Sequence, residues 1–151
     1  MDINTIPDSF AGDLKAFFLS APPVVFDEKN VRLQHEKANL VSPRLVILCG
    51  DPKRVPKMDG TANVPVSMEI VTSMDRSTGE AHQNLAGALQ SWWLTIRSQR
   101  LSETTFPRCY LHDFLVMPAS TIERPRDGER ERVTTLRANA IITLFADPQL
   151  L

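Results

Sequence analysis

Cysteine is scarce in this sequence, and the spacing of its two thiols excludes some kinds of chemistry. Cys49 and Cys109 are the only cysteines among 151 residues, and neither belongs to a C-x-x-C pair. Zinc sites and dithiol redox centres use such pairs. Both thiols lie in apolar or strand-like surroundings, so we expect them to be buried and reduced.

Long apolar runs and an excess of one charge are missing too. The sequence has no run of about 18 consecutive apolar residues, and residues 1–10 lack the basic and apolar regions of a signal peptide. We therefore expect a soluble protein made in a cytoplasm, without membrane contact. The formal net charge of −1 argues against nucleic acid as the main partner, because such proteins usually carry a basic face.

Recognisable catalytic motifs are absent as well. The six glycines are scattered, and the segment 50–53, Gly-Asp-Pro-Lys, lacks the second glycine and the Lys-Ser/Thr ending of a phosphate loop. None of the three histidines, His35, His82 and His112, belongs to a catalytic motif. We expect His82 on the outer edge of a helix, where solvated or structurally bonded histidines are common. The sequence therefore predicts no enzyme active site.

A small metal-dependent nuclease is the alternative of another class. Such enzymes hold a divalent ion with acidic residues close to a lysine, and Asp51, Lys53 and Glu69 are the one combination of this type. Among 18 acidic residues some pair flanks a strand in any case, and Glu69 falls on the polar face of its strand. We therefore expect no metal and no cofactor.

What the sequence does contain is the composition of one globular domain, residues 1–151. It is 42% apolar and 23% charged, and a chain of this length buries roughly two thirds of its unfolded surface. The order of its elements predicts an α+β fold. We expect a mainly antiparallel sheet of about 4–5 strands, two helices packed on it and a long C-terminal β-hairpin.

Two segments have the apolar spacing of helices. Residues 6–20 form the first, which ends at a Pro-Pro pair, and residues 81–96 form the second. Trp93 lies about 100° round the second helix from Trp92. Either one indole meets another subunit, or the helix has a wide core-facing side that shelters both.

The strands are predicted from other patterns. The continuous apolar run 44–49 predicts a central strand covered on both faces, and the alternation over 64–74 predicts a half-exposed strand. Short apolar pieces at 24–26 and 31–33 suggest an edge strand or an irregular arm. The segment 51–63, rich in proline and charge, is expected to be a surface loop.

The C-terminal part, 109–146, predicts a projecting hairpin with a charged tip. Its arms 109–121 and 133–146 are joined by 122–132, which contains an Asp-Gly pair suited to a tight turn. The charges of the tip nearly cancel; they are Glu123, Arg124, Arg126, Asp127, Glu129, Arg130, Glu131 and Arg132. Mixed charge suits a complementary protein partner. The alternative is a solvated tip that only keeps the hairpin soluble.

In its layout the chain resembles the tail-terminator proteins of long-tailed bacteriophages and the related neck and tail-completion proteins. Four segments carry this resemblance: the strand 44–50, the alternating strand 64–72, the helix 80–89 and the closing strand 136–144. The resemblance covers most of the chain and is one of element order and pattern.

The resemblance implies a structural protein of the virion. Tail terminators form a ring, usually of six subunits, that caps the finished tail tube, stops its polymerisation and presents a surface to the head or neck. The implied partners are other copies of the chain, the tail tube protein and a head or neck connector, and DNA passes through the lumen without specific binding. The implied location is the tail or neck of a virion assembled in the host cytoplasm, and a neck or head-completion protein is the near alternative.

A ring needs contacts in which an element of one subunit docks on a different surface of the next. We expect the hairpin to be that element. The interface candidates chosen by charge density are Arg124, Arg126, Asp127, Glu129, Arg130 and Arg132, and Trp93 is added for its off-stripe position.

Overall fold

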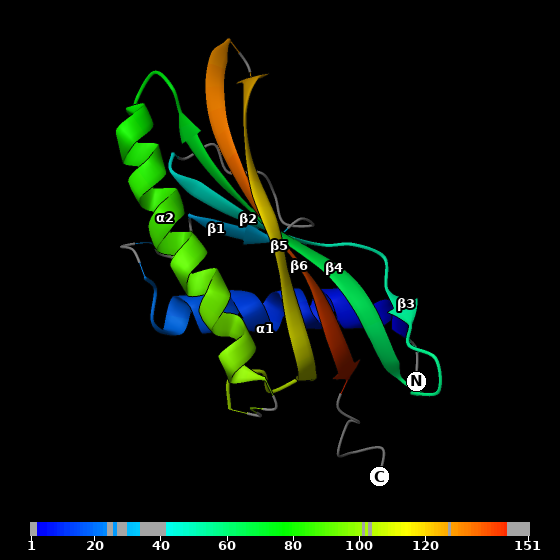
Figure 1. Ribbon diagram of the computed structural model, residues 1–151. Coiled ribbons are helices and arrows are strands. Elements are labelled where there is room, and N and C mark those ends of the chain that lie inside the picture. The colour runs from blue at the N-terminus through cyan, green and yellow to red at the C-terminus, as the bar shows by residue number, and fades with distance from the viewer. Residues whose placement is uncertain are drawn as a thin grey trace.

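Two helices pack on a six-stranded sheet in the computed structural model of the chain (Figure 1). The residues that the structure describes are 3–23, 26, 30–33, 42–100, 102, 104–126 and 128–144. Several predictions made from the sequence lie outside them: the apolar pair 24–25, the hairpin end 145–146, His35 and Asp127.

The elements follow in the predicted order of helix, strands, helix and hairpin. Their bounds are η1 Ile3–Thr5, α1 Ile6–Ser20, β1 Val31–Leu33, β2 Arg44–Cys49, β3 Lys53–Arg54, β4 Thr61–Ser73, α2 Gly79–Thr95, η2 Ile96–Gln99, β5 Cys109–Arg126 and β6 Glu129–Leu144. The strand order is β1-β2-β4-β6-β5, and β3 pairs with β4. Among the described strands only β1 and β2 pair in parallel, so the predicted α+β fold with a mainly antiparallel sheet is confirmed.

Both helices bury their apolar stripes in the same core. Phe10, Leu14 and Phe18 of α1 are fully buried, and so is Leu89 of α2. The rings of Phe18 and Trp92 meet edge to face with centroids 5.2 Å apart, which joins the two helices directly. Helix α2 begins at Gly79, two residues before the predicted 81, because the Thr78 hydroxyl caps it by accepting a hydrogen bond from the Ala81 amide at 3.0 Å.

Trp93 belongs to the core of its own chain, which corrects its choice as an interface residue. Its side chain is only 1% exposed, and its indole N–H donates to the carbonyl of Arg137 at 3.2 Å. Its ring packs edge to face on Phe114 of β5, with centroids 5.0 Å apart. The inner side of α2 is therefore wide enough for Trp92 and Trp93 together, the second alternative left open by the sequence.

Strand β2 is an inner strand, but it is not covered on both faces as predicted. Leu45 and Ile47 are fully buried toward the helices, whereas Val46 on the other face is half-buried. The middle of the sheet is β4, and its predicted alternation is confirmed. Val64 and Met68 are fully buried on the helix side.

The expected surface loop 51–63 is partly a strand pair. Lys53 and Arg54 form β3, which pairs with the start of β4, so that Lys53 lies opposite Asn63. Gly60 has a φ of 73°, and this left-handed conformation allows the tight return. A strand of two residues is too short to show the alternation of apolar and polar side chains by which strands are recognised in a sequence.

Candidate assembly surface

The hairpin of β5 and β6 is confirmed, but most of it lies within the sheet. Arg126 pairs with Glu129, so the turn is the predicted two-residue one, and Gly128 has a φ of 81°. Strand β6 pairs with β4 as far as Ser73 and Glu131. Only the tip beyond that pair projects, as the upper end of the hairpin in Figure 1 shows. The charged segment 122–132 is therefore paired strand and not a long loop.

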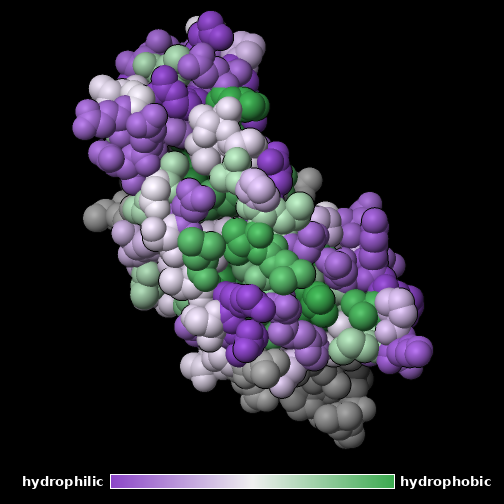
Figure 2. All heavy atoms as spheres, in the orientation of Figure 1, coloured by the Kyte–Doolittle hydropathy of each residue, from purple (hydrophilic) through white to green (hydrophobic). Residues whose placement is uncertain are grey.

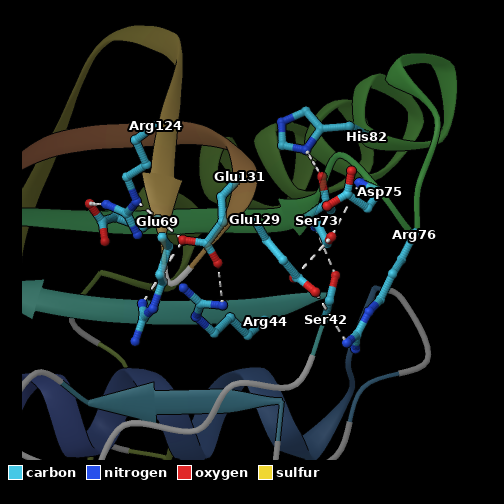
Figure 3. Close-up of polar contacts among 12 residues, drawn as sticks. Ser42, Arg44, Glu69, Ser73, Asp75, Arg76, His82, Arg124, Glu129 and Glu131 are labelled. Carbon is cyan, nitrogen blue, oxygen red and sulfur yellow. Dashed lines mark hydrogen bonds and ion pairs between the residues drawn. The ribbon is translucent and has the colours of Figure 1, made fainter.

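Glu131 is the centre of a network of ion pairs at the base of the tip (Figure 3). One of its carboxylate oxygens lies 2.7 Å from Nη1 of Arg44, and the two side chains are 7% and 5% exposed. Its other oxygen is 3.4 Å from Nε of Arg124, and Nη1 of the same arginine lies 3.7 Å from the Glu69 carboxylate. Burial alone raises the pKa of Glu131, but the hydrogen bonds and charges of Arg44 and Arg124 outweigh it and lower the pKa below its usual value.

The more exposed charges of the tip also pair within the chain. Glu123 lies 3.9 Å from Arg130 and 3.8 Å from Arg132, and Arg76 lies 3.5 Å from Glu129. The pair of Glu123 and Arg132 arises because these residues face each other in the antiparallel register of β5 and β6. The charged interface candidates were expected to pair with the next subunit. Their charges are instead largely balanced by partners in their own chain.

His82 is buried, contrary to its predicted place on the outer edge of α2. Its side chain is 1% exposed, and its two ring nitrogens lie 2.7 Å from the hydroxyls of Thr72 and Thr134. A further hydroxyl contact of 2.9 Å links Thr134 to Thr121 of β5. Burial, and then the charge of Arg132, lowers the pKa of His82, so the ring is neutral near pH 7. His82 is thus a structural link between α2, β4 and the hairpin.

Strand β5 forms one edge of the sheet, and no other described strand pairs with its outer side. All nine residues from Leu115 to Glu123 are exposed. They include four large apolar side chains, Leu115, Val116, Met117 and Ile122, which are between 38% and 55% exposed. Figure 2 shows apolar side chains gathered near the middle of the view, where β5 crosses the molecule.

The edge of β5 carries little protection against pairing with another chain. Between Asp113 and Glu123 it has no charged residue. Its protection is the irregular register between Met117 and Ser120, where Pro118 also lacks an N–H group. The sequence patterns did not predict this surface. The run of uncharged residues at 114–122 was the signal that could have indicated it, but only the strand order places it at an edge.

The residues of the nuclease alternative are not brought together. Glu69 is six residues beyond Asn63 on β4, which puts it roughly 20 Å from Lys53 along the strand. It pairs with Arg124 instead. Within the described part of the chain, no group of three or more His, Cys, Asp or Glu side chains is arranged to hold a metal ion. His112 contacts the hydroxyl of Thr143 at 2.7 Å.

The two thiols are free, and only Cys109 is buried as predicted, while Cys49 is half-buried. Burial raises the pKa of each to about 12, with further increases from Asp8 at Cys49 and from Asp13 at Cys109. Both thiols are therefore protonated at neutral pH and are poor nucleophiles.

The sequence matches no protein-family model and no curated protein. No helix of the described residues is long and apolar enough to cross a membrane. What the fold and its surface define is a small α+β protein with a long, uncharged and partly apolar strand edge.

Proposed function

We propose that this chain is a structural protein of a bacteriophage virion, a tail terminator whose subunits form a ring. The ring caps the tail tube, stops its polymerisation and offers the surface that joins the head or neck. The observation that carries the proposal is the free edge of β5, together with the resemblance in element order described above.

A free strand edge is a natural docking element, because its unpaired N–H and C=O groups bind another extended segment. Exposed apolar side chains such as Met117 and Val116 add burial on contact. In a ring, each subunit presents such an edge to a different surface of the next subunit. The proposed contact between subunits therefore uses the outer edge of β5 and not the charged tip alone.

The direct test is the mass of the purified protein in solution, measured by native mass spectrometry and light scattering over a range of concentrations. We expect the wild type to assemble into a closed ring, either alone or on tail tubes. Met117→Lys should raise the concentration needed for assembly at least about tenfold, since a lysine charge must lose water in the contact.

Met58→Lys is the matched control, because Met58 is a similarly exposed methionine in the turn before β4. This variant should assemble like the wild type. Circular dichroism checks that both variants are folded. A wild type that stays monomeric at every concentration and binds no tail component would refute the proposal.

A further inference from the structure

A groove separates α2 from the hairpin on the helix side of the sheet. It has a volume of about 420 Å³, within the range of ligand pockets. Six of the residues that line it are Gln83, Gly87 and Gln90 of α2 with Thr121, Arg132 and Thr134 of the hairpin. In Figure 1 the hairpin and α2 run along each other at the upper part of the molecule. We call this feature the α2–hairpin groove.

The groove is open because the helix presents small or flexible side chains to it. A Cβ atom built on Gly87 would have no neighbour within 4 Å. Gln83 and Gln90 are exposed, and their amides can bond to a peptide backbone. On the other side the groove reaches Thr121 of the free edge strand. An extended segment that adds to β5 would place alternate side chains in this groove.

The charged side chain in the groove indicates which kind of group would bind there. Among the described residues that line it, Arg132 is the one with a charge at neutral pH, and its side chain is 19% exposed. Within the described part of the chain its buried Nη1 atom has no hydrogen-bond partner, and its Nη2 atom forms only a long ion pair, 3.8 Å, with Glu123. The guanidinium lies close to Gly79, at the start of α2, where the helix dipole also favours an anion. A carboxylate therefore complements this end of the groove.

We propose that the α2–hairpin groove receives the hairpin tip of a second copy of the chain, with the carboxylate of Glu129 on Arg132. This inference rests on the proposed ring. The tip is an extended acidic and basic segment that already projects from the sheet. The side chain of Glu129 is 45% exposed, and its contacts with other described side chains, Arg76 and Ser73, are long at 3.5 Å. Each tip would thus dock beside the edge strand of its neighbour.

The test fills the groove without harming the fold. Gly87→Leu puts a large side chain into open space and replaces a poor helix former, so the variant should be folded with a higher melting temperature. We expect the concentration needed for assembly to rise at least tenfold. The control, Asn84→Leu, adds the same side chain at an exposed position of α2 that does not line the groove. It should assemble like the wild type. Equal assembly of Gly87→Leu and wild type would overturn the inference and leave the ring intact.

A second measurement separates this inference from the proposed function. A synthetic peptide of residues 122–132 is titrated into the protein, and the backbone amide signals of Gly87 and Thr121 are followed by NMR. We expect shifts with this peptide, shifts at least fivefold weaker with a peptide that has Glu129→Gln, and none with the Gly87→Leu protein. If the wild type forms no ring but these shifts occur, the inference that the groove binds the tip is supported and the proposed function fails. Absence of the shifts in a monomeric wild type overturns the groove.

Discussion

At the scale of single residues, the least expected feature is the ion pair of Arg44 and Glu131. It joins β2 to β6 across β4, so it connects the hairpin to the far half of the sheet. Two charges that are more than nine-tenths buried lose much hydration, and such a pair stabilises the fold only when its partners are well bonded. Removing one partner is costly because the other charge stays buried.

Glu131→Gln should therefore lower the free energy of unfolding by about 3–5 kcal/mol at pH 7. Because the folded-state pKa of Glu131 is lowered, its contribution is fully present above the unfolded value near 4.5 and is lost as pH falls through the folded value. Urea denaturation at several pH values measures both effects. The control Glu123→Gln removes a 46% exposed carboxylate and should cost less than about 1 kcal/mol. Equal losses in the two variants would contradict the role of the buried pair.

His82 shows at the same scale why a side chain can be misplaced from sequence. Its position relative to the apolar stripe of α2 indicated exposure, yet the hairpin base lies over it and supplies Thr134 as a partner. Neutral imidazole has one donor and one acceptor, and threonine hydroxyls can take either role. A polar residue is stable in the core here because both of its nitrogens are bonded.

At the scale of elements, the charged segment of the hairpin is better described as two paired strands with unequal ion pairs. Arg124 is 33% exposed and contacts both Glu131 and Glu69, whereas Arg130 is 66% exposed and has one long contact with Glu123. The arginines of the tip are therefore not equivalent. Neutralising all four arginines of the tip together would weaken the hairpin itself as well as any contact with a neighbouring subunit.

Single substitutions separate these roles. Arg124→Gln should lower the free energy of unfolding by about 1–2 kcal/mol, because it leaves the buried Glu131 with fewer partners. Arg130→Gln should change it by less than about 0.5 kcal/mol. Denaturant unfolding measures the difference, and amide hydrogen exchange of β5 and β6 locates it. If Arg130→Gln were the more destabilising variant, the network around Glu131 would not be what holds the tip.

At the scale of the whole molecule, the sheet ends in two different strands. Strand β1 has three residues and β5 has eighteen, and the second is the edge with the exposed apolar side chains. Such asymmetry suits a contact between unlike surfaces, which closes into a ring if the rotation between subunits allows it. A two-fold dimer would instead require the same surface on both partners.

The proposed role predicts a defect in tail length. Tails assembled without the protein should carry over-long tubes in electron micrographs, because nothing stops polymerisation. Adding the wild type or Met58→Lys should restore a uniform length, whereas Met117→Lys should not. Tails of normal length that fail to join heads would instead identify a neck or head-completion protein, the alternative that the resemblance leaves open.

The sequence by itself determined the fold class and the order of the elements. Apolar periodicity is a local property, and it identified α1, α2, β4 and the hairpin because each buries one regular face. The Asp-Gly pair fixed the turn for a similar reason, since Gly128 takes a positive φ there at little cost.

Only the tertiary structure decided which surfaces are free. Trp93 and His82 are covered by β5 and β6, the tip charges find partners that the strand register brings opposite them, and β5 lies at an edge. Each of these outcomes depends on contacts between residues far apart in the chain. Periodicity states that a strand has an apolar face, but the order of strands in the sheet determines whether its backbone meets a neighbour or remains open to a partner.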